Sequence, residues 1–214
     1  MNDLSNYRKS YEKSELLETN IPEDPINLFN RWFHEVEDFG ASGEVNAMTV
    51  STIGLDGFPK SRVVLLKKFS EEGFIFYTNY DSEKGKAIAE NPRVCLSFFW
   101  QEMERQVIIK GIAQKTSEII SDNYFDSRPD GSKLGAIVSK QSEVIPSRTF
   151  LEENLKKLEA AFEGKHIPRP ENWGGFLVTP LEVEFWQGRP NRLHDRIRYQ
   201  SQSDFSWKIE RLSS

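Results

Sequence analysis

A short segment near the C-terminus gathers several side chains that could bind or act on a ligand. Three cationic side chains and one carboxylate stand within the five residues Arg192 to Arg196, and Trp186 belongs to the aromatic stretch just before them. A run of charges usually forms a solvated surface. Positive charges packed this closely repel one another, however, unless an anion compensates them. The segment is therefore a candidate site for an anionic ligand.

Two earlier segments could also bind an anion. Arg62 and Lys67 flank four apolar residues, and the simplest interpretation is a buried strand with a solvated charge at each end. Ser82 and Lys84 open a short predicted helix after a strand that ends at Asn79. Free N–H groups at a helix start, a hydroxyl and a lysine can bind a phosphate, although similar caps occur on most helices. Neither segment identifies a site by itself.

The common catalytic signatures are absent from the sequence. His34, His166 and His194 lie far apart without the spacing of a zinc site, so no metal site is predicted. Cys95 stands in the middle of a predicted strand and is interpreted as a plain core thiol. There is also no G-x-S-x-G elbow and no phosphate-binding P-loop. If the chain is an enzyme, an organic cofactor is expected to carry the chemistry.

Composition limits the class of protein. The net charge of −5 argues against a dedicated nucleic-acid binder, whereas local basic clusters in an acidic chain suit a small anionic ligand. A single cysteine excludes an intramolecular disulfide and favours a reducing compartment. The N-terminus has no signal-peptide pattern, and no apolar run approaches the ~20 residues of a membrane span. We expect a soluble, cytoplasmic protein without a membrane partner.

The elements that must position these residues are mostly strands. Residues 1–22 are polar and are predicted to form a flexible N-terminal arm, and residues 23–214 a single domain. Apolar residues at three- and four-residue spacing predict a helix from Pro25 to about Gly40. Asp56-Gly57 is a strong hairpin signal between two strands. The predicted strands are AMTVSTI, SRVVLLKKF, FIFYTN, RVCLSFFW, RQVIIKGIA, GFLVTP, LEVEFWQG and SWKIERL.

Further helices are predicted between these strands. They span about 82–91, 117–126, 132–138 and 147–164, and the last is expected to be capped by Ser147 and to point Phe150, Leu151, Leu155, Leu158 and Phe162 inward. Strands and helices do not alternate, and no G-x-G-x-x-G fingerprint occurs, so a doubly wound sheet is disfavoured. The pattern predicts a mainly β fold, an antiparallel barrel with helical insertions.

Residues 183–196, with Trp186-Gln187 and the order R-L-H-D-R, resemble the C-terminal signature of the pyridoxamine 5′-phosphate oxidase family. The resemblance extends over nearly the whole chain, in order, through RVVLLK, FYTN, NPRV, ERQV, YFDSRP, SKQS and WKIERL. It implies an FMN-binding split β-barrel that works as a homodimer, with FMN held between the subunits. The chemistry that it implies is the oxidation of pyridoxamine or pyridoxine 5′-phosphate to pyridoxal 5′-phosphate, with O2 reduced to H2O2.

The resemblance also implies roles for individual residues. The residues expected at FMN are Arg62, Val63, Val64, Leu65, Leu66, Lys67, Tyr77, Thr78, Lys84, Gln106, Gln141, Ser142, Trp186 and Arg196. Those expected at the substrate are Lys67, Tyr124, Arg128 and Ser132 around its phosphate, Arg192 and His194 around its pyridine ring, and Arg8 and Tyr11 from the arm. Arg192 and His194 are also the candidate catalytic residues, because they would position the substrate and favour its reactive protonation state.

One position departs from the family pattern. Where members commonly have Ser-Arg-Lys, this chain has Ser82-Glu83-Lys84, and a carboxylate cannot bind the FMN phosphate as an arginine would. Glu83 is expected to point to solvent or to pair with a nearby cation such as Lys86. The alternative from another class is a non-catalytic split-barrel protein that binds flavin or haem. A barrel that binds single-stranded nucleic acid is disfavoured by the net charge.

Overall fold

The computed structural model describes residues 2–7, 9–40 and 43–214. The chain divides into two compact units, which we call unit 1 (Met1–Val50, Cys95–Gly111 and Pro180–Ser214) and unit 2 (Ser51–Val94 and Ile112–Thr179). Seven strands are hydrogen-bonded in the order β2 (Pro59–Leu65), β1 (Ala47–Ile53), β5 (Arg93–Trp100), β6 (Arg105–Lys115), β7 (Trp173–Gln187), β4 (Gly73–Asn79) and β3 (Lys68–Ser70). β8 (Asp195–Ser201) pairs with β7, and β9 (Trp207–Arg211) pairs with β8. Helices join this mainly antiparallel sheet, in agreement with the predicted fold class. The predicted division into an arm and a single domain stays a prediction.

Unit 1 is organised around helix α1 (Pro25–Asp38). Asp24 caps the helix by accepting a hydrogen bond from the backbone N–H of Ile26 at 2.7 Å. One apolar face of the helix is buried, and on it Phe29 packs edge-on against Phe98. The helix ends close to Gly40, which has a φ of 68°. The predicted helix is therefore confirmed, and its spacing of apolar residues is what gives it a core face.

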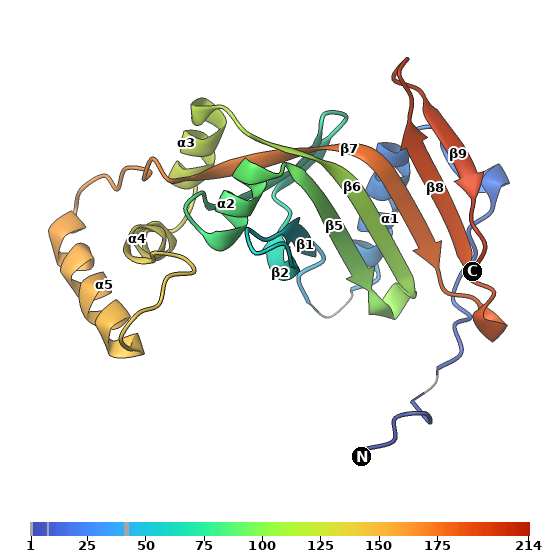
Figure 1. Cartoon of the computed structure of the whole chain (residues 1–214), viewed down its shortest axis with the longest axis horizontal. Coiled ribbons are helices and arrows are strands. Elements are labelled where there is room, and N and C mark those ends of the chain that lie inside the picture. The colour runs from blue at the N-terminus through green and yellow to red at the C-terminus, as the bar shows by residue number, and fades with distance from the viewer. Residues whose placement is uncertain (1, 8, 41–42) are drawn as a thin grey trace. The chain divides into compact units, whose positions relative to one another are not determined.

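The strands of unit 1 include the sequences that bracket the charged C-terminal segment. They are parts of β1 (Ala47–Ile53), β5 (Arg93–Trp100), β6 (Arg105–Lys115) and β7 (Trp173–Gln187), together with β8 (Asp195–Ser201) and β9 (Trp207–Arg211). β8 and β9 lie side by side next to the C-terminal end of β7 (Figure 1). The sequence did not predict β8, in which buried Ile197 and Tyr199 alternate with polar residues.

Unit 2 contains β2 (Pro59–Leu65), β3 (Lys68–Ser70) and β4 (Gly73–Asn79). The single predicted strand SRVVLLKKF is therefore two strands, interrupted at Leu66 and Lys67. The predicted strands GFLVTP and LEVEFWQG are instead one continuous strand, β7. β4 is almost wholly buried and pairs with β7 from Phe74–Val178 to Asn79–Trp173. This pairing fixes the end of β4, where predicted site residues stand.

Four helices complete unit 2: α2 (Glu83–Glu90), α3 (Glu118–Asp126), α4 (Asp130–Val138) and α5 (Arg148–Phe162). Ser82 and Ser147 cap α2 and α5 as predicted. A core cluster of Phe125, Leu134, Ile167 and Trp173 is covered by side chains of α5, namely Leu155, Leu158 and Phe162. Phe150 is 45% exposed, so the prediction that it points inward is wrong. α4 and α5 pack beside each other (Figure 1).

Candidate functional site

The largest concentration of predicted site residues lines a cavity of ≈1070 Å³ in unit 2. β2 and the end of β4 form one part of its wall, the start of α2 and the segment from α3 to residue 142 form another, and Lys67 and Trp173 complete the lining. We call this cavity the unit 2 pocket. The predicted residues that line it are Arg62, Val63, Val64, Leu65, Lys67, Tyr77, Thr78, Lys84, Tyr124, Arg128, Ser132, Gln141 and Ser142. Leu66 was also predicted, but its side chain is 3% exposed and does not line the pocket.

One end of the unit 2 pocket is built around the ammonium group of Lys84. Its Nζ donates to Thr78 Oγ1 at 2.8 Å, to Gln141 Oε1 at 2.9 Å and to Ser82 Oγ at 3.3 Å. The pKa of Lys84 is lowered to about 8, mainly by burial and then by the positive charge of Arg62, while the negative charge of Glu83 opposes these shifts. Three oxygen acceptors thus surround an ammonium group that loses its proton at a lower pH than an exposed lysine does.

Arg62 supplies a second cation at this end. Its Nη1 donates to Thr52 Oγ1 at 2.9 Å and to the carbonyl oxygen of Lys60 at 2.8 Å, so β1 and β2 fix the guanidinium. Burial lowers the pKa of Arg62, and Glu83 counteracts that shift. Glu83 forms an ion pair with Lys60, and both residues line the pocket. Glu83 thus pairs with a cation as expected, but the partner is Lys60 rather than Lys86.

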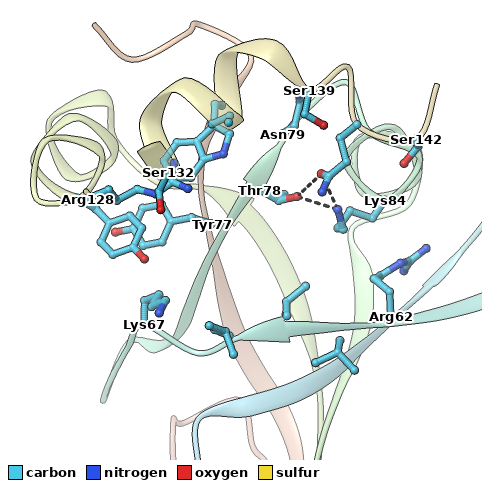
Figure 2. Close-up of a pocket in the computed structure, with 18 of the residues that line it drawn as sticks. Arg62, Lys67, Tyr77, Thr78, Asn79, Lys84, Arg128, Ser132, Ser139 and Ser142 are labelled. Atoms are coloured by element: carbon cyan, nitrogen blue, oxygen red, sulfur yellow. Dashed lines mark hydrogen bonds between the residues drawn. The ribbon is translucent and has the colours of Figure 1, made fainter. Parts of the chain in front are cut away.

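A second group of cations and hydroxyls lies at the opposite side of the pocket, where Figure 2 shows Lys67, Arg128 and Ser132 well separated from Arg62 and Lys84. Tyr77 stacks on Tyr124 with ring centroids 3.8 Å apart. α3 ends at Asp126, so Arg128 lies beyond the helix that carries Tyr124. Both side chains nevertheless line the same pocket.

The surroundings of the Arg128 guanidinium indicate which kind of ligand this end of the unit 2 pocket can bind. Its carbon lies 4.5 Å from the ring centroid of Trp173, and burial lowers the pKa of Arg128. Its Nη1 is buried and has no hydrogen-bond partner within the described part of the chain. A buried donor without an acceptor is unfavourable, and an anion that reached it would remove that penalty. The residues present therefore fit a phosphate here, as the hydroxyls and cations around Lys84 do at the other end.

A second, smaller cavity of ≈540 Å³ lies in unit 1, and we call it the unit 1 pocket. Its lining includes the remaining predicted residues Gln106, Trp186, Arg192, His194 and Arg196. The segment Pro190–Arg192 that enters it is a short 3-10 turn in which Asn191 and Arg192 have φ values of 58° and 64°. This left-handed backbone is unusual for arginine and is often found at functional sites.

His194 has a defined tautomer in the unit 1 pocket. Its Nδ1 accepts a hydrogen bond from the backbone N–H of Arg189 at 3.0 Å, so the neutral ring carries its proton on Nε2. Burial lowers the pKa of His194, Arg192 lowers it further, and Asp195 opposes them. The ring centroid lies 4.8 Å from that of Trp186. The imidazole is therefore a neutral donor at neutral pH, packed against an aromatic face.

Arg196 is more strongly tied than the sequence indicated. Its Nε donates to Glu184 Oε1 and its Nη1 to the carbonyl oxygen of Ser213, both at 2.8 Å. The hydrogen bond to Glu184 raises the pKa of Arg196. Gln106 also has a partner, because its Nε2 donates to Ser97 Oγ at 3.3 Å. Arg196 and Gln106 are thus already held by neighbouring groups of the protein.

The N-terminal arm reaches the same pocket. The ring of Tyr11 lies 5.7 Å from that of Trp186 and 5.8 Å from that of His194. Glu104, which is 2% exposed, anchors this part of the arm by accepting hydrogen bonds from the backbone N–H groups of Glu12 and Lys13. Arg8, the other arm residue predicted at the substrate, lies outside the described residues. Sequence reasoning missed Glu104, since an isolated glutamate carries no local signal of such a role.

Among residues 2–7, 9–40 and 43–214, no three His, Cys, Asp or Glu side chains come together as a metal site would require. Over the same residues, no helix is long and apolar enough to cross a membrane.

Comparisons with known proteins give consistent results. Residues 34–161 match a family described as "Pyridoxamine 5'-phosphate oxidase", and residues 173–214 match a "Pyridoxine 5'-phosphate oxidase C-terminal dimerisation region". A pyridoxine/pyridoxamine 5'-phosphate oxidase of Flavobacterium johnsoniae is 94% identical over 214 residues and matches over all of both chains. The corresponding oxidase of Trichormus variabilis is 49% identical over 210 residues, covering 98% of each chain.

Solved structures extend the comparison to the fold. PhzG from Burkholderia lata, in complex with tetrahydrophenazine-1-carboxylic acid, is similar with a TM-score of 0.87 at 28% identity, covering 95% of this chain and 100% of its own. A pyridoxamine 5'-phosphate oxidase-related, FMN binding protein from Nostoc punctiforme has a TM-score of 0.69 at 15% identity, covering 88% of this chain and 96% of its own. At that identity the second match concerns the fold alone.

Proposed function

The chain belongs to the pyridoxamine 5′-phosphate oxidase family, and from that premise we propose that it oxidises pyridoxamine and pyridoxine 5′-phosphate to pyridoxal 5′-phosphate while O2 is reduced to H2O2. FMN is the proposed cofactor, and when bound it would supply the redox chemistry by accepting a hydride equivalent from the substrate. The observation that carries the proposal is the unit 2 pocket with cationic groups at two separate ends. FMN and the proposed substrates carry one phosphate each, so two such ends are needed.

At the first end, the proposal assigns the FMN phosphate to Arg62, Lys84 and the hydroxyl of Thr78. Ammonium and guanidinium groups form short charge-assisted hydrogen bonds with phosphate oxygens. Thr78 and Lys84 already share Gln141 Oε1 as an acceptor, at 3.0 and 2.9 Å, and a phosphate oxygen can replace an oxygen of that kind. The start of α2 adds its N-terminal dipole, which favours negative charge.

At the second end, the proposal assigns the substrate phosphate to Lys67, Tyr124, Arg128 and Ser132. The unpaired Nη1 of Arg128 supports this assignment, because a phosphate oxygen would satisfy it. The contact of Arg128 with Trp173 restrains the guanidinium, so less conformational freedom is lost when the phosphate binds.

The unit 1 residues would act on the pyridine ring. His194, neutral and protonated on Nε2, can donate one hydrogen bond, and Arg192 can stabilise negative charge. We propose that these two groups orient the substrate and favour its reactive protonation state. Tyr11 would exclude water from them, since its ring packs on Trp186 and His194.

The proposal includes a homodimer with FMN held between the subunits, in the cytoplasm. Its support is that residues 173–214, which match the dimerisation region, include Trp186, Arg192, His194 and Arg196 of the unit 1 pocket. A segment that both contributes to a ligand pocket and matches a dimerisation region suits a site to which both subunits contribute.

The deciding experiment is an absorbance spectrum of the purified chain followed by a peroxide assay with pyridoxamine 5′-phosphate. We expect a flavin spectrum that stays with the protein after FMN is added and the unbound flavin is removed, and peroxide formation that depends on the substrate. The alternative, a flavin- or haem-binding split-barrel protein without catalysis, predicts a coloured protein that forms no peroxide. A colourless protein that cannot be reconstituted with FMN would exclude the proposed function.

A further inference from the structure

Glu83, the position where the sequence departs from the Ser-Arg-Lys pattern, forms an ion pair with Lys60. Both side chains line the end of the unit 2 pocket that also contains Arg62 and Lys84. Lys60 precedes Arg62 by two residues on β2, so the two side chains share a face of the strand. Arg62 also donates to the Lys60 carbonyl oxygen at 2.8 Å, which ties the two residues together.

Positive charges outnumber negative charges at this end of the pocket. The carboxylate of Glu83 contacts Lys60 directly, and it lies at the same end as two further cations, Arg62 and Lys84. Burial lowers the pKa values of Arg62 and Lys84, and the charge of Glu83 opposes both shifts, so its field reaches all three cations. One carboxylate leaves a net charge of about +2 at neutral pH, which a phosphate dianion would balance.

The ion pair itself is easily rearranged. The side chains of Lys60 and Glu83 are 55% and 43% exposed. Exposed ion pairs contribute little to stability, so Lys60 can exchange Glu83 for another anion without disturbing the fold. A lysine side chain is also long and flexible, with three donors that can be redirected.

Resting on the proposed function, we propose that Lys60 is a further ligand of the FMN phosphate and that Glu83 competes with the phosphate for it. The lysine on β2 supplies the positive charge that the acidic residue at the start of α2 does not. Glu83 would then weaken FMN binding while keeping Lys60 beside the pocket.

The test is a titration of FMN into the full-length, flavin-stripped chain, with riboflavin as a matched ligand that lacks the phosphate. At low ionic strength Lys60→Gln should weaken FMN binding about fivefold, and Glu83→Gln should tighten it about threefold. Riboflavin binding should stay unchanged in both variants. Higher salt should reduce both effects, because exposed charges are screened.

A double variant separates a phosphate ligand from a mere partner of Glu83. If Lys60 binds the phosphate, Lys60→Gln weakens FMN binding by at least about fivefold in the Glu83→Gln background, because no carboxylate then competes for the lysine. If the effect of Lys60→Gln disappears in that background, Lys60 only neutralises Glu83 and the inference is overturned. Lys60→Arg should restore FMN binding, since it keeps the charge and the donors.

Lys86→Gln is the control for the general electrostatic field. Lys86 is exposed on the same helix and does not line this pocket. We expect less than about a twofold change from it, and an effect as large as that of Lys60→Gln would overturn the inference. If the unaltered chain binds neither FMN nor riboflavin, the proposed function itself fails. If it binds FMN but Lys60→Gln has no effect, the inference fails and the proposed function stands.

Discussion

Lys84 carries its charge in a place where burial disfavours it. The pKa of this ammonium group falls to about 8, mainly because of burial and then because of Arg62. As the pH rises through about 8, the unliganded side chain loses its proton, and the phosphate subsite loses one positive charge. A bound phosphate favours the charged form, so it raises the pKa again and binding takes up a proton.

FMN affinity should therefore fall with pH above about 8. We expect the dissociation constant to rise by up to about tenfold per pH unit there, until the pKa of Lys84 in the complex is reached. Flavin titrations at pH 7, 8 and 9 measure this slope. Lys84→Arg provides the control, because arginine stays charged over this range and should flatten the profile. A steep slope that persists in Lys84→Arg would assign the titration to another group.

Arg192 and His194 should separate binding of the flavin from turnover. Both are assigned to the substrate, so Arg192→Ala and His194→Ala should keep FMN and lose activity. Loss of one charged hydrogen bond corresponds to ~1.5–3 kcal/mol, or roughly 10- to 100-fold in kcat/KM. Flavin content and steady-state kinetics are the two measurements.

His166→Ala is the matched control for this pair, since His166 is exposed, pairs with Asp126 and lines neither pocket. It should leave both flavin content and kcat/KM unchanged. A flavin-free Arg192→Ala or His194→Ala protein that regained normal activity on reconstitution would reverse the assignment.

Individual site residues differ in how far sequence alone could predict them. The density of charge around His194 is local, so it is visible in the sequence. The Lys60–Glu83 pair joins residues 23 positions apart on a strand and a helix, and only tertiary structure brings them together. Glu104 lies 92 positions from the backbone N–H of Glu12 that it binds. Long-range partners of this kind have no periodic signature.

At the scale of elements, the sequence predicted where helices begin better than where strands end. The cap residues Ser82 and Ser147 act through local hydrogen bonds, which the sequence carries directly. The sequence predicted two strands in place of β7, with the division directly after Pro180. The strand continues, since it pairs with β4 up to Val178 and with β8 from Glu182, which leaves the proline between the two ladders. β8 was missed because its charges were interpreted only as chemistry, although Glu184 neutralises Arg196 across the strands.

The start of α2 depends on a close approach that only glycine permits. A Cβ atom at Gly85 would lie 2.1 Å from the carbonyl oxygen of Tyr80. Gly85→Ala should therefore displace the helix start, lower the free energy of unfolding by about 1–3 kcal/mol and weaken FMN binding by moving Lys84. Urea denaturation and flavin titration check the two effects.

Gly131→Ala is the control for that change. Gly131 stands in the first turn of α4, and a Cβ atom there would meet nothing within 4 Å in the part of the chain that the structure describes. This substitution should leave stability unchanged or raise it by up to about 1 kcal/mol. If Gly85→Ala were as stable as the unaltered chain, α2 could shift to accommodate the added methyl group without lowering the free energy of unfolding.

For the whole molecule, the resemblance to a family predicted more about fold and ligand than periodicity and composition did. Periodicity and composition predicted a mainly β fold with an anionic ligand, but they left the ligand open. The ordered match of many short segments pointed to the family, which the comparisons then confirmed. The division into units 1 and 2 had no signal in the sequence, because four strands contribute to both.

We propose that each site of the dimer draws its unit 2 residues from one subunit and its unit 1 residues from the other, which has a direct consequence for activity. Several apolar side chains are exposed on the single chain, among them Val63 at 70% and Phe99 at 55%, and a dimer could bury surface of this kind. Sedimentation of the FMN-loaded protein should give a species of twice the 24.8 kDa chain mass. A fully active monomer would refute the dimer.

Mixing two inactive variants tests the shared site more sharply. Arg128→Ala damages the unit 2 pocket, and Arg192→Ala damages the unit 1 pocket. In a mixed dimer, one site receives both damaged pockets and the other receives both intact ones. Random exchange of subunits should therefore restore about a quarter of the normal activity, since half of the dimers are mixed and each has one intact site. If each site belonged to a single chain, every site in the mixture would carry one damaged pocket, and mixing would restore nothing.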